Sequence, residues 1–441
     1  MVLGTEGDSV VHVQIAGSNG RYYDHELAQS IRLPPSLLPE VILVLLIVGA
    51  FTRCFSRRTS YFWRVCAVSV AAWTAARLYS SYLLDAQPGF GWLGNLVLFL
   101  MRFGKSASGM PPLQYLLNHS DSRMLTHIAE VRDASARLQA SLQEVSVARV
   151  EHHHFKARDG YQLHILLTFP SSPGGLADDT RLLPLVVYFH GGAFVTQSSE
   201  SMQFLARTAA NAIGAVVASV DYRLAPEARF PTAVEDCIDS VGFLAKHARR
   251  LGADPGRLIL MGDSAGGNLA AVTALATARP PRWQWRMFGS TRAIERVRLP
   301  RGARVAAQIL LQPVIAPYCP FGSAVRLFQN LIVGEGLCTW MWNAYLSDPL
   351  HDAADPRASP LLDRHVLWSR VPPAIVVTGH FDPLADEGDA YANHLAKRGV
   401  QVHATRRLEV HSMHGPDTLS WAFGAAKAVA HGEQVEVPPL V

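Results

Sequence analysis

The stretch Gly262-Asp263-Ser264-Ala265-Gly266 decides how the second half of this chain is interpreted. It directly follows a short apolar run, Leu258–Met261, which predicts a buried strand, and it precedes a helix-prone segment. A serine at the apex of a sharp strand-to-helix turn needs small neighbours, which the two glycines supply. We therefore expect the Ser264 hydroxyl to stand exposed above the edge of a sheet, where it can act as a nucleophile.

A second glycine-rich turn, His190-Gly191-Gly192-Ala193-Phe194, follows another apolar strand-like run. Glycines in that turn allow the backbone N–H groups of Gly191 and Gly192 to face a substrate carbonyl, with the N–H of Ala265 as a third donor. Such an oxyanion hole stabilises the transition state, and losing one donor typically costs about 3 kcal/mol. The alternative is a turn that merely ends a strand, and the order of the two motifs disfavours it.

A serine nucleophile needs a base and a carboxylate that orients the base. Asp382 follows a strand-like run, and His414 lies near the C-terminus, which gives the chain order Ser, Asp, His. Asp386 is the alternative carboxylate, but its position suits a cap of the following helix. His411 is the alternative base, and the glycine that follows His414 favours His414.

The segment from about residue 150 to the C-terminus alternates short apolar runs with helix-like segments. This alternation predicts an α/β domain with a mostly parallel central sheet and helices on both faces. The turn Arg158-Asp159-Gly160 predicts an antiparallel hairpin where the chain enters the sheet. The expected strands are 162–169, 183–189, 215–220, 257–261, 306–311 and 374–378, and the expected helices are 201–213, 232–249, 268–277 and 386–397.

These motifs together resemble the hormone-sensitive lipase family of α/β-hydrolases, which includes arylacetamide deacetylases and bacterial esterases. The resemblance spans roughly residues 150–425 and rests most specifically on DYRLAPE (221–227), together with ASPL (358–361) and FDPLADEG (381–388). It implies the α/β-hydrolase fold with a helical cap. It also implies hydrolysis of short or medium acyl esters or acetyl groups through an acyl-enzyme, without metal or cofactor. The motif residues expected to support the site are His190, Gly262, Asp263 and Gly266.

The cap is expected at about residues 106–145 and 317–350. In the second piece, Trp340, Met341 and Trp342 either line an apolar acyl pocket or form ordinary core. The sequence departs from the family pattern at Ala193, in place of a third glycine, and at Pro416, where an aromatic residue is common. An insertion at 280–304 contains seven arginines, and it either rests on an anionic membrane surface or forms a solvated loop.

Residues 1–105 form an apolar region that differs from the hydrolase domain, residues 106–441. The run Val41–Phe51 is continuously apolar but shorter than the roughly 20 residues that span a bilayer as a helix. Either a membrane anchor near residues 37–56 with interfacial helices, or a soluble helical cap, fits this pattern. We expect membrane association, with the endoplasmic reticulum as one candidate compartment and the topology open.

Composition excludes other partners. The formal charge of +4 over 441 residues gives no case for nucleic-acid binding, and five widely spaced cysteines signal neither disulfides nor zinc. The run His152-His153-His154 does not predict a metal site, because neighbouring residues of a strand point to opposite faces. The expected partner is a small, lipophilic ester.

Two other functions remain as alternatives. An amide hydrolase of the arylformamidase type shares the HGG turn and the serine elbow, but DYRLAPE argues against it. A ligand receptor on the same scaffold would lack the catalytic histidine, whereas this chain retains His414.

Overall fold

A computed structural model of the chain describes residues 2–5, 11–14, 132, 145–171, 182–278, 296–318, 321, 323, 335–364, 366–412 and 414–435. The chain divides into two compact units, Met1–Met110 and Pro111–Val441. In the first unit the structure describes an antiparallel pair, β1 (Val2–Thr5) and β2 (Val11–Gln14).

Several expectations fall outside these residues. The anchor expected near residues 37–56 lies outside them, as do nearly all of the first cap piece and residues 280–295 of the basic insertion. Within the described residues, no helix combines the length and the apolar character needed to cross a membrane. The last part of the insertion is described, and there Val297 is buried and its N–H donates to the carbonyl of Ala276.

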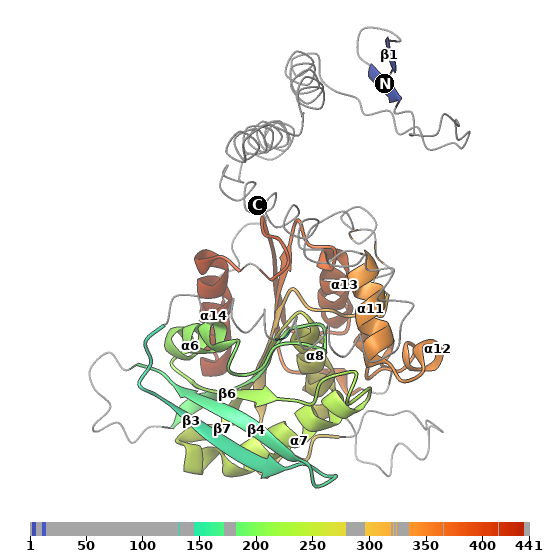
Figure 1. The fold of residues 1–441 in the computed structure, drawn as a ribbon. Coiled ribbons are helices and arrows are strands. Elements are labelled where there is room, and N and C mark those ends of the chain that lie inside the picture. Colours follow the sequence, from blue (N-terminus) through green and yellow to red (C-terminus); the bar gives the residue numbers. More distant parts are fainter. Residues whose placement is uncertain are drawn as a thin grey trace, which may run out of the picture. The chain divides into compact units, whose positions relative to one another are not determined.

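The second unit is organised around an eight-stranded sheet in the order β10-β9-β8-β7-β5-β6-β4-β3 (Figure 1). The pairs from β10 to β6 are parallel, whereas β6–β4 and β4–β3 are antiparallel. The predicted mostly parallel sheet and the hairpin at 158–160 are therefore confirmed. The strands are β3 (Arg149–Lys156), β4 (Gln162–Phe169), β5 (Leu183–Phe189), β6 (Val216–Asp221), β7 (Ala253–Asp263), β8 (Val305–Leu311), β9 (Ala374–Gly379) and β10 (Val402–Arg407).

Helices cover both faces of this sheet, as predicted. One buried cluster joins Val186 and Tyr188 of β5 to α6 (Gln203–Ile213) and α14 (Pro416–His431). The alternate β5 residues Leu185, Val187 and Phe189 join the opposite cluster, because successive side chains of a strand point to opposite faces. The helices of that opposite cluster are α7 (Thr232–His247), α8 (Ala265–Thr277), α11 (Glu335–Tyr345) and α13 (Ala385–Ala396). The short helices are α12 (Pro349–Asp352), η2 (Ala248–Leu251), η3 (Pro360–Leu362) and η4 (Trp368–Arg370).

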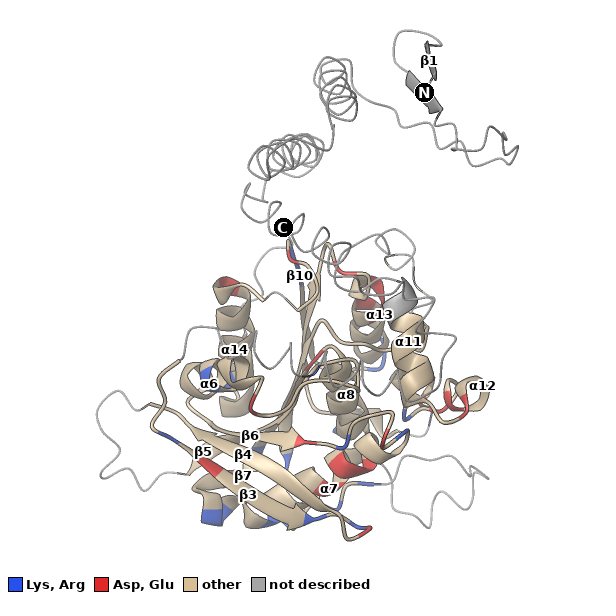
Figure 2. Ribbon diagram, viewed as in Figure 1, with Lys and Arg blue, Asp and Glu red and all other residues tan. Residues whose placement is uncertain are grey.

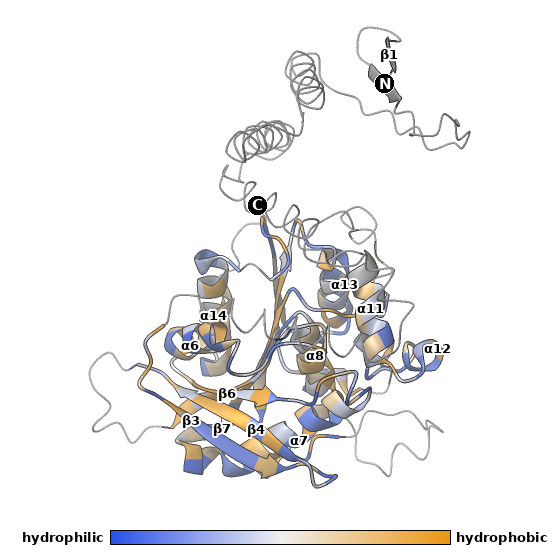
Figure 3. Ribbon diagram, in the orientation of Figure 1, coloured by the Kyte–Doolittle hydropathy of each residue, from blue (hydrophilic) through white to orange (hydrophobic). Residues whose placement is uncertain are grey.

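The central strands are apolar on both faces because helices cover both. Strands β5, β8 and β9 contain no Lys, Arg, Asp or Glu (Figure 2). By contrast, the edge strand β3 includes polar residues that face solvent, and its ribbon in Figure 3 is partly blue. The polarity of each strand therefore follows its place in the sheet.

Pro416 begins helix α14. Proline is favoured in the first turn, where its missing N–H has no intrahelical partner, and α14 starts at Pro416. The helix ends at Gly432, whose φ of 75° is in the left-handed region that glycine adopts without strain.

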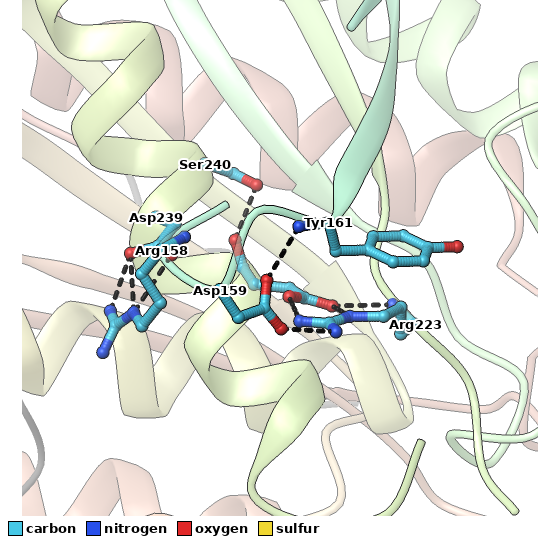
Figure 4. Close-up of polar contacts among 7 residues, drawn as sticks. Arg158, Asp159, Tyr161, Arg223, Asp239 and Ser240 are labelled. Carbon is cyan, nitrogen blue, oxygen red and sulfur yellow. Dashed lines mark hydrogen bonds and ion pairs between the residues drawn. The ribbon is translucent and has the colours of Figure 1, made fainter. Parts of the chain in front are cut away.

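The Arg223 side chain of DYRLAPE ties the β3–β4 turn to α7 (Figure 4). Its guanidinium donates to Asp236 at 2.6 Å and to Asp159 at 2.7 Å. The Asp236 side chain is only 1% exposed, so loss of its partner would leave a buried charge uncompensated, at a cost of about 3–5 kcal/mol. Next to this pair, Arg158 of the same β3–β4 turn donates to Asp239 of α7. These contacts explain why this motif contains an arginine at this position.

Candidate active site

Ser264 stands between the end of β7 and the start of α8, in a strained backbone conformation with φ 53° and ψ −119°. A Cβ at Gly262 would lie 2.1 Å from the carbonyl oxygen of Gly266, and one at Gly266 would lie 1.9 Å from that of Phe189. The turn therefore requires glycine at both positions, as predicted. The residue as a whole is buried, with 8% of its surface exposed, and its hydroxyl contacts His411 Nε2.

The structure places His411, not His414, beside the nucleophile. His411 Nε2 lies 2.9 Å from Ser264 Oγ, and His411 Nδ1 lies 3.0 Å from Asp382 Oδ2. The other oxygen of Asp382 accepts the N–H of Leu384 at 2.9 Å, which fixes the carboxylate. Ser264 and Asp382 thus come together as expected, and the sequence-based choice of His414 as the base is wrong.

The position of His414 has a physical reason. The Gly415 N–H donates to the Glu409 carboxylate at 2.8 Å, so the glycine that favoured His414 serves the turn leading into α14. The His414 ring packs inside that turn, with Nδ1 4.0 Å from Glu409 Oε2 and 8% of its side chain exposed. Burial lowers the pKa of His414 to about 4, so the ring is neutral at pH 7.

The buried His414 predicts a loss of stability in acid. The unfolded histidine has a pKa of about 6.5, and the folded one about 4. The unfolded chain therefore binds more protons between these values, and stability falls as the pH drops from 6.5 toward 4. In urea unfolding across this pH range, His414→Gln should remove up to about 3 kcal/mol of that loss. An unchanged pH dependence in this variant would show that His414 titrates alike in both states.

Asp386 does not cap the helix. It lies in the first turn of α13, where its carboxylate accepts from Arg406 at 2.9 Å and from the Ser323 N–H at 2.7 Å. The expected cap is wrong, because the loop before α13 is held by Asp382 instead.

The structure also changes the expected oxyanion hole. The Gly191 N–H donates to Asp263 Oδ1 at 2.9 Å, so it already has an acceptor within the protein. The prediction that Gly191 contributes a donor to the oxyanion hole is therefore wrong. Gly192 has φ 108°, and a Cβ there would lie 2.3 Å from the Thr196 carbonyl oxygen. Among the described residues, the N–H groups of Gly192 and Ala265 have no acceptor. Ala193, with φ 59°, continues the turn and is a candidate third donor that the sequence reasoning missed.

Asp263 fixes the glycine turn against the serine elbow. Besides the Gly191 N–H, its Oδ1 accepts the Tyr188 hydroxyl of β5 at 2.6 Å. Burial raises the pKa of both groups, which keeps Tyr188 protonated as a donor. Asp263, which directly precedes Ser264, therefore couples the end of β5 and the glycine turn to the serine elbow.

His190 supports the same turn from its other side. Its ring stacks on Tyr222 with centroids 4.4 Å apart, and the Tyr222 hydroxyl donates to the His190 carbonyl oxygen at 2.7 Å. Burial lowers the pKa of His190, so its ring is held neutral. Through these contacts with Tyr222, His190 supports the backbone of the glycine turn.

Aromatic side chains pack behind the glycine turn. The ring of Phe194 stacks on Tyr345 with centroids 4.0 Å apart and contacts Trp342 at 5.4 Å. All three side chains are fully buried, so Trp342 belongs to the core in this structure. The sequence left open whether the aromatic residues at 340–342 line an acyl pocket or form ordinary core, and for Trp342 the structure supports ordinary core.

Arg132, from the first expected cap piece, binds two loops next to the site. Its guanidinium donates to the carbonyl oxygens of Val195 at 2.7 Å and Ala225 at 3.0 Å, and it pairs with Glu227 at 2.9 Å. The contact joins the loop after the glycine turn to DYRLAPE.

The histidine run lies on the edge strand β3. His152 contacts His164 at 3.0 Å, whereas His153 contacts Glu151 at 3.2 Å. Over the ranges that the structure describes, no group of three or more His, Cys, Asp or Glu side chains is arranged to hold a metal ion.

The chain is similar to known esterases in sequence and in structure. A family model described as "alpha/beta hydrolase fold" matches residues 186–415. The ethyl acetate hydrolase of Pseudomonas putida is 31% identical over 306 residues, which cover 69% of this chain and 85% of that protein. The carboxylic ester hydrolase LipN of Mycobacterium tuberculosis is 34% identical over 56% of this chain and 64% of its own length. A solved esterase structure from Pyrobaculum calidifontis is 34% identical, covers 69% of this chain and 93% of that chain, and superposes with a TM-score of 0.57.

Proposed function

The chain belongs to the hormone-sensitive-lipase-like branch of the α/β-hydrolase family, and from this premise we propose that it cleaves carboxylic esters through an acyl-enzyme on Ser264. Its enzyme class is carboxylic-ester hydrolase, the class named for the relatives compared above. The observation that carries the mechanism is the hydrogen-bonded series Ser264–His411–Asp382.

The distances support acyl transfer in two stages. His411 Nε2, 2.9 Å from Ser264 Oγ, accepts the serine proton while Oγ attacks the ester carbonyl carbon. The tetrahedral intermediate collapses, His411 returns the proton to the leaving alkoxide, and the alcohol departs. Water then attacks the acyl-enzyme with His411 again as the base, which releases the acid and restores Ser264. Asp382 orients the ring and stabilises its protonated form.

The tetrahedral intermediate carries a negative oxygen that needs donors. Gly192 and Ala265 have N–H groups without an acceptor among the described residues, and α8 begins at Ala265. The partial positive charge at the start of that helix favours an anion there. These groups, with Ala193 as the candidate third donor, form the proposed oxyanion hole.

The proposed substrates are lipophilic esters with short or medium acyl groups, including acetates. This part of the proposal is supported by the family resemblance and by the apolar run Val41–Phe51, which suits a membrane-associated enzyme that receives substrate from a bilayer. The assembled triad favours catalysis over a receptor on the same scaffold, because a receptor has no need of a base bonded to the serine.

The test combines turnover with covalent labelling. We expect the purified chain to hydrolyse p-nitrophenyl esters, with a preference for acyl chains from acetate to octanoate, and a fluorophosphonate to label one peptide that contains Ser264. The matched control is Ser264→Ala, which should lose both turnover and label. A folded wild-type chain that neither hydrolyses these esters nor takes the label would refute the proposed function.

A further inference from the structure

Gln312 contacts the chain on both sides of His411. It directly follows β8, and its side chain is buried. Its Nε2 donates to the carbonyl oxygen of Val410 at 3.1 Å, and its Oε1 accepts the N–H of Ser412 at 2.6 Å. One side-chain amide therefore binds the peptide groups immediately before and after the base.

Gln312 is itself fixed close to the nucleophile. Its N–H donates to the carbonyl oxygen of Val377 in β9 at 2.7 Å, and the preceding Leu311 accepts the Ser264 N–H at 2.9 Å. The backbone of Gln312 has φ 45°, in the left-handed region that is costly for a residue with a side chain. A strained backbone conformation of this kind persists only where surrounding contacts hold it, and residues in such conformations are often found at functional sites.

The segment that carries His411 needs such support. Strand β10 ends at Arg407, and α14 begins only at Pro416. Among the described residues, neither the Val410 carbonyl oxygen nor the Ser412 N–H has a backbone partner. Ser412 has φ 61°, so the turn after His411 is also in a conformation that other contacts must hold. Among the described residues, these two backbone groups therefore find their hydrogen-bond partners in the Gln312 amide.

We propose that Gln312 is a positioning residue that holds the His411 imidazole between Ser264 and Asp382 by binding the peptide groups on either side of it. The inference rests on the proposed function, because it concerns the reaction of that same triad. The hydrogen bonds of the Gln312 amide go to the backbone beside His411 and not to the Ser264 hydroxyl or the His411 ring, so Gln312 acts through His411.

The experiment replaces Gln312 by methionine, which has a similar shape and cannot make either hydrogen bond. We expect kcat for p-nitrophenyl acetate to fall about 10- to 100-fold with little change in KM, since a displacement of about 1 Å at a catalytic group costs up to 10²-fold. The rate at which a fluorophosphonate labels Ser264 should fall by a similar factor, because labelling also needs the base.

Gln308→Met is the matched control. Gln308 is another buried glutamine, within β8, and its Nε2 donates to the Pro372 carbonyl oxygen at 3.0 Å, away from the triad residues. Gln308→Met removes a comparable buried amide and should leave kcat unchanged, whatever it does to thermal stability. If Gln312→Met does not fold, Gln312→Asn takes its place, because it keeps the amide but shortens the side chain by one methylene.

A double-mutant cycle separates positioning from a general structural effect. In the His411→Ala background, the Gln312 substitution should cost nothing further, because groups that act as a unit are not additive. The inference is overturned if the residual activity of His411→Ala falls again by the same factor, or if Gln312→Met keeps the wild-type kcat and labelling rate. A wild-type chain that takes the fluorophosphonate but hydrolyses none of these esters would count against the proposed substrates and not against this inference, because the labelling rates would still decide the role of Gln312.

Discussion

Replacing His411 by alanine is expected to lower kcat/KM for p-nitrophenyl acetate about 10⁴-fold or more, as loss of the general base does in other serine hydrolases. The reason is geometric, because His411 Nε2 is 2.9 Å from Ser264 Oγ and its Nδ1 is bonded to Asp382. No other described side chain makes both contacts. Steady-state kinetics with active-site titration gives the measurement.

The matched variant is His414→Gln, which removes the histidine that the sequence pattern favoured. His414 lies against Glu409 inside the turn before α14, so its loss should change kcat/KM by no more than about threefold. Circular dichroism and size-exclusion chromatography establish that both variants fold. The reverse result, an active His411→Ala and an inactive His414→Gln, would return the role of base to His414.

The second large effect concerns stability. Gly266→Ala is expected to destabilise the fold by about 3–5 kcal/mol, since the added Cβ would lie 1.9 Å from the Phe189 carbonyl oxygen and 2.5 Å from that of His190. Both are backbone atoms of the central sheet and the glycine turn, so neither can move aside cheaply. Urea unfolding measures the loss, and the turnover of the surviving folded protein should fall because the elbow and the oxyanion turn separate.

Gly424→Ala provides the control for this substitution. Gly424 is exposed in α14, and a Cβ there meets no atom within 4 Å. Alanine is favoured over glycine inside a helix by about 1 kcal/mol, so Gly424→Ala should leave stability unchanged or raise it. Equal losses in the two variants would contradict the steric account of Gly266.

Hydrophobic patterning predicted most of the sheet. The expected strands 162–169 and 183–189 coincide with β4 and β5, and the helix expected at 232–249 is α7 with a slightly earlier end. These predictions succeeded because a buried strand or an amphipathic helix is recognisable within a few consecutive residues. The elbow at Ser264 was equally local, since its two glycines are required by contacts of the turn itself and the adjacent strand.

The choice between two histidines three positions apart was different. Both histidines follow the last strand, and the glycine at 415 favoured His414, which is not the base. The N–H of this glycine binds Glu409, so the glycine is explained by the turn and not by catalysis. Which ring faces Ser264 depends on the path of the chain around His411, and Gln312, which directly follows β8, binds the peptide groups on both sides of that residue. No pattern near the histidines contains this information.

The donors of the oxyanion hole were also predicted only in part from the sequence. The alternating pattern predicted that the glycine turn and the serine elbow each follow a strand of a mostly parallel sheet, and parallel strands bring their carboxyl ends to one edge of the sheet. That β5 and β7 are direct neighbours was learned from the fold. Which of the turn's N–H groups lack an acceptor among the described residues depends on contacts between distant parts of the chain. The carboxylate of Asp263 reaches across from β7 and binds the Gly191 N–H, and a hydrogen bond between residues so far apart in the chain is fixed by packing rather than by local sequence.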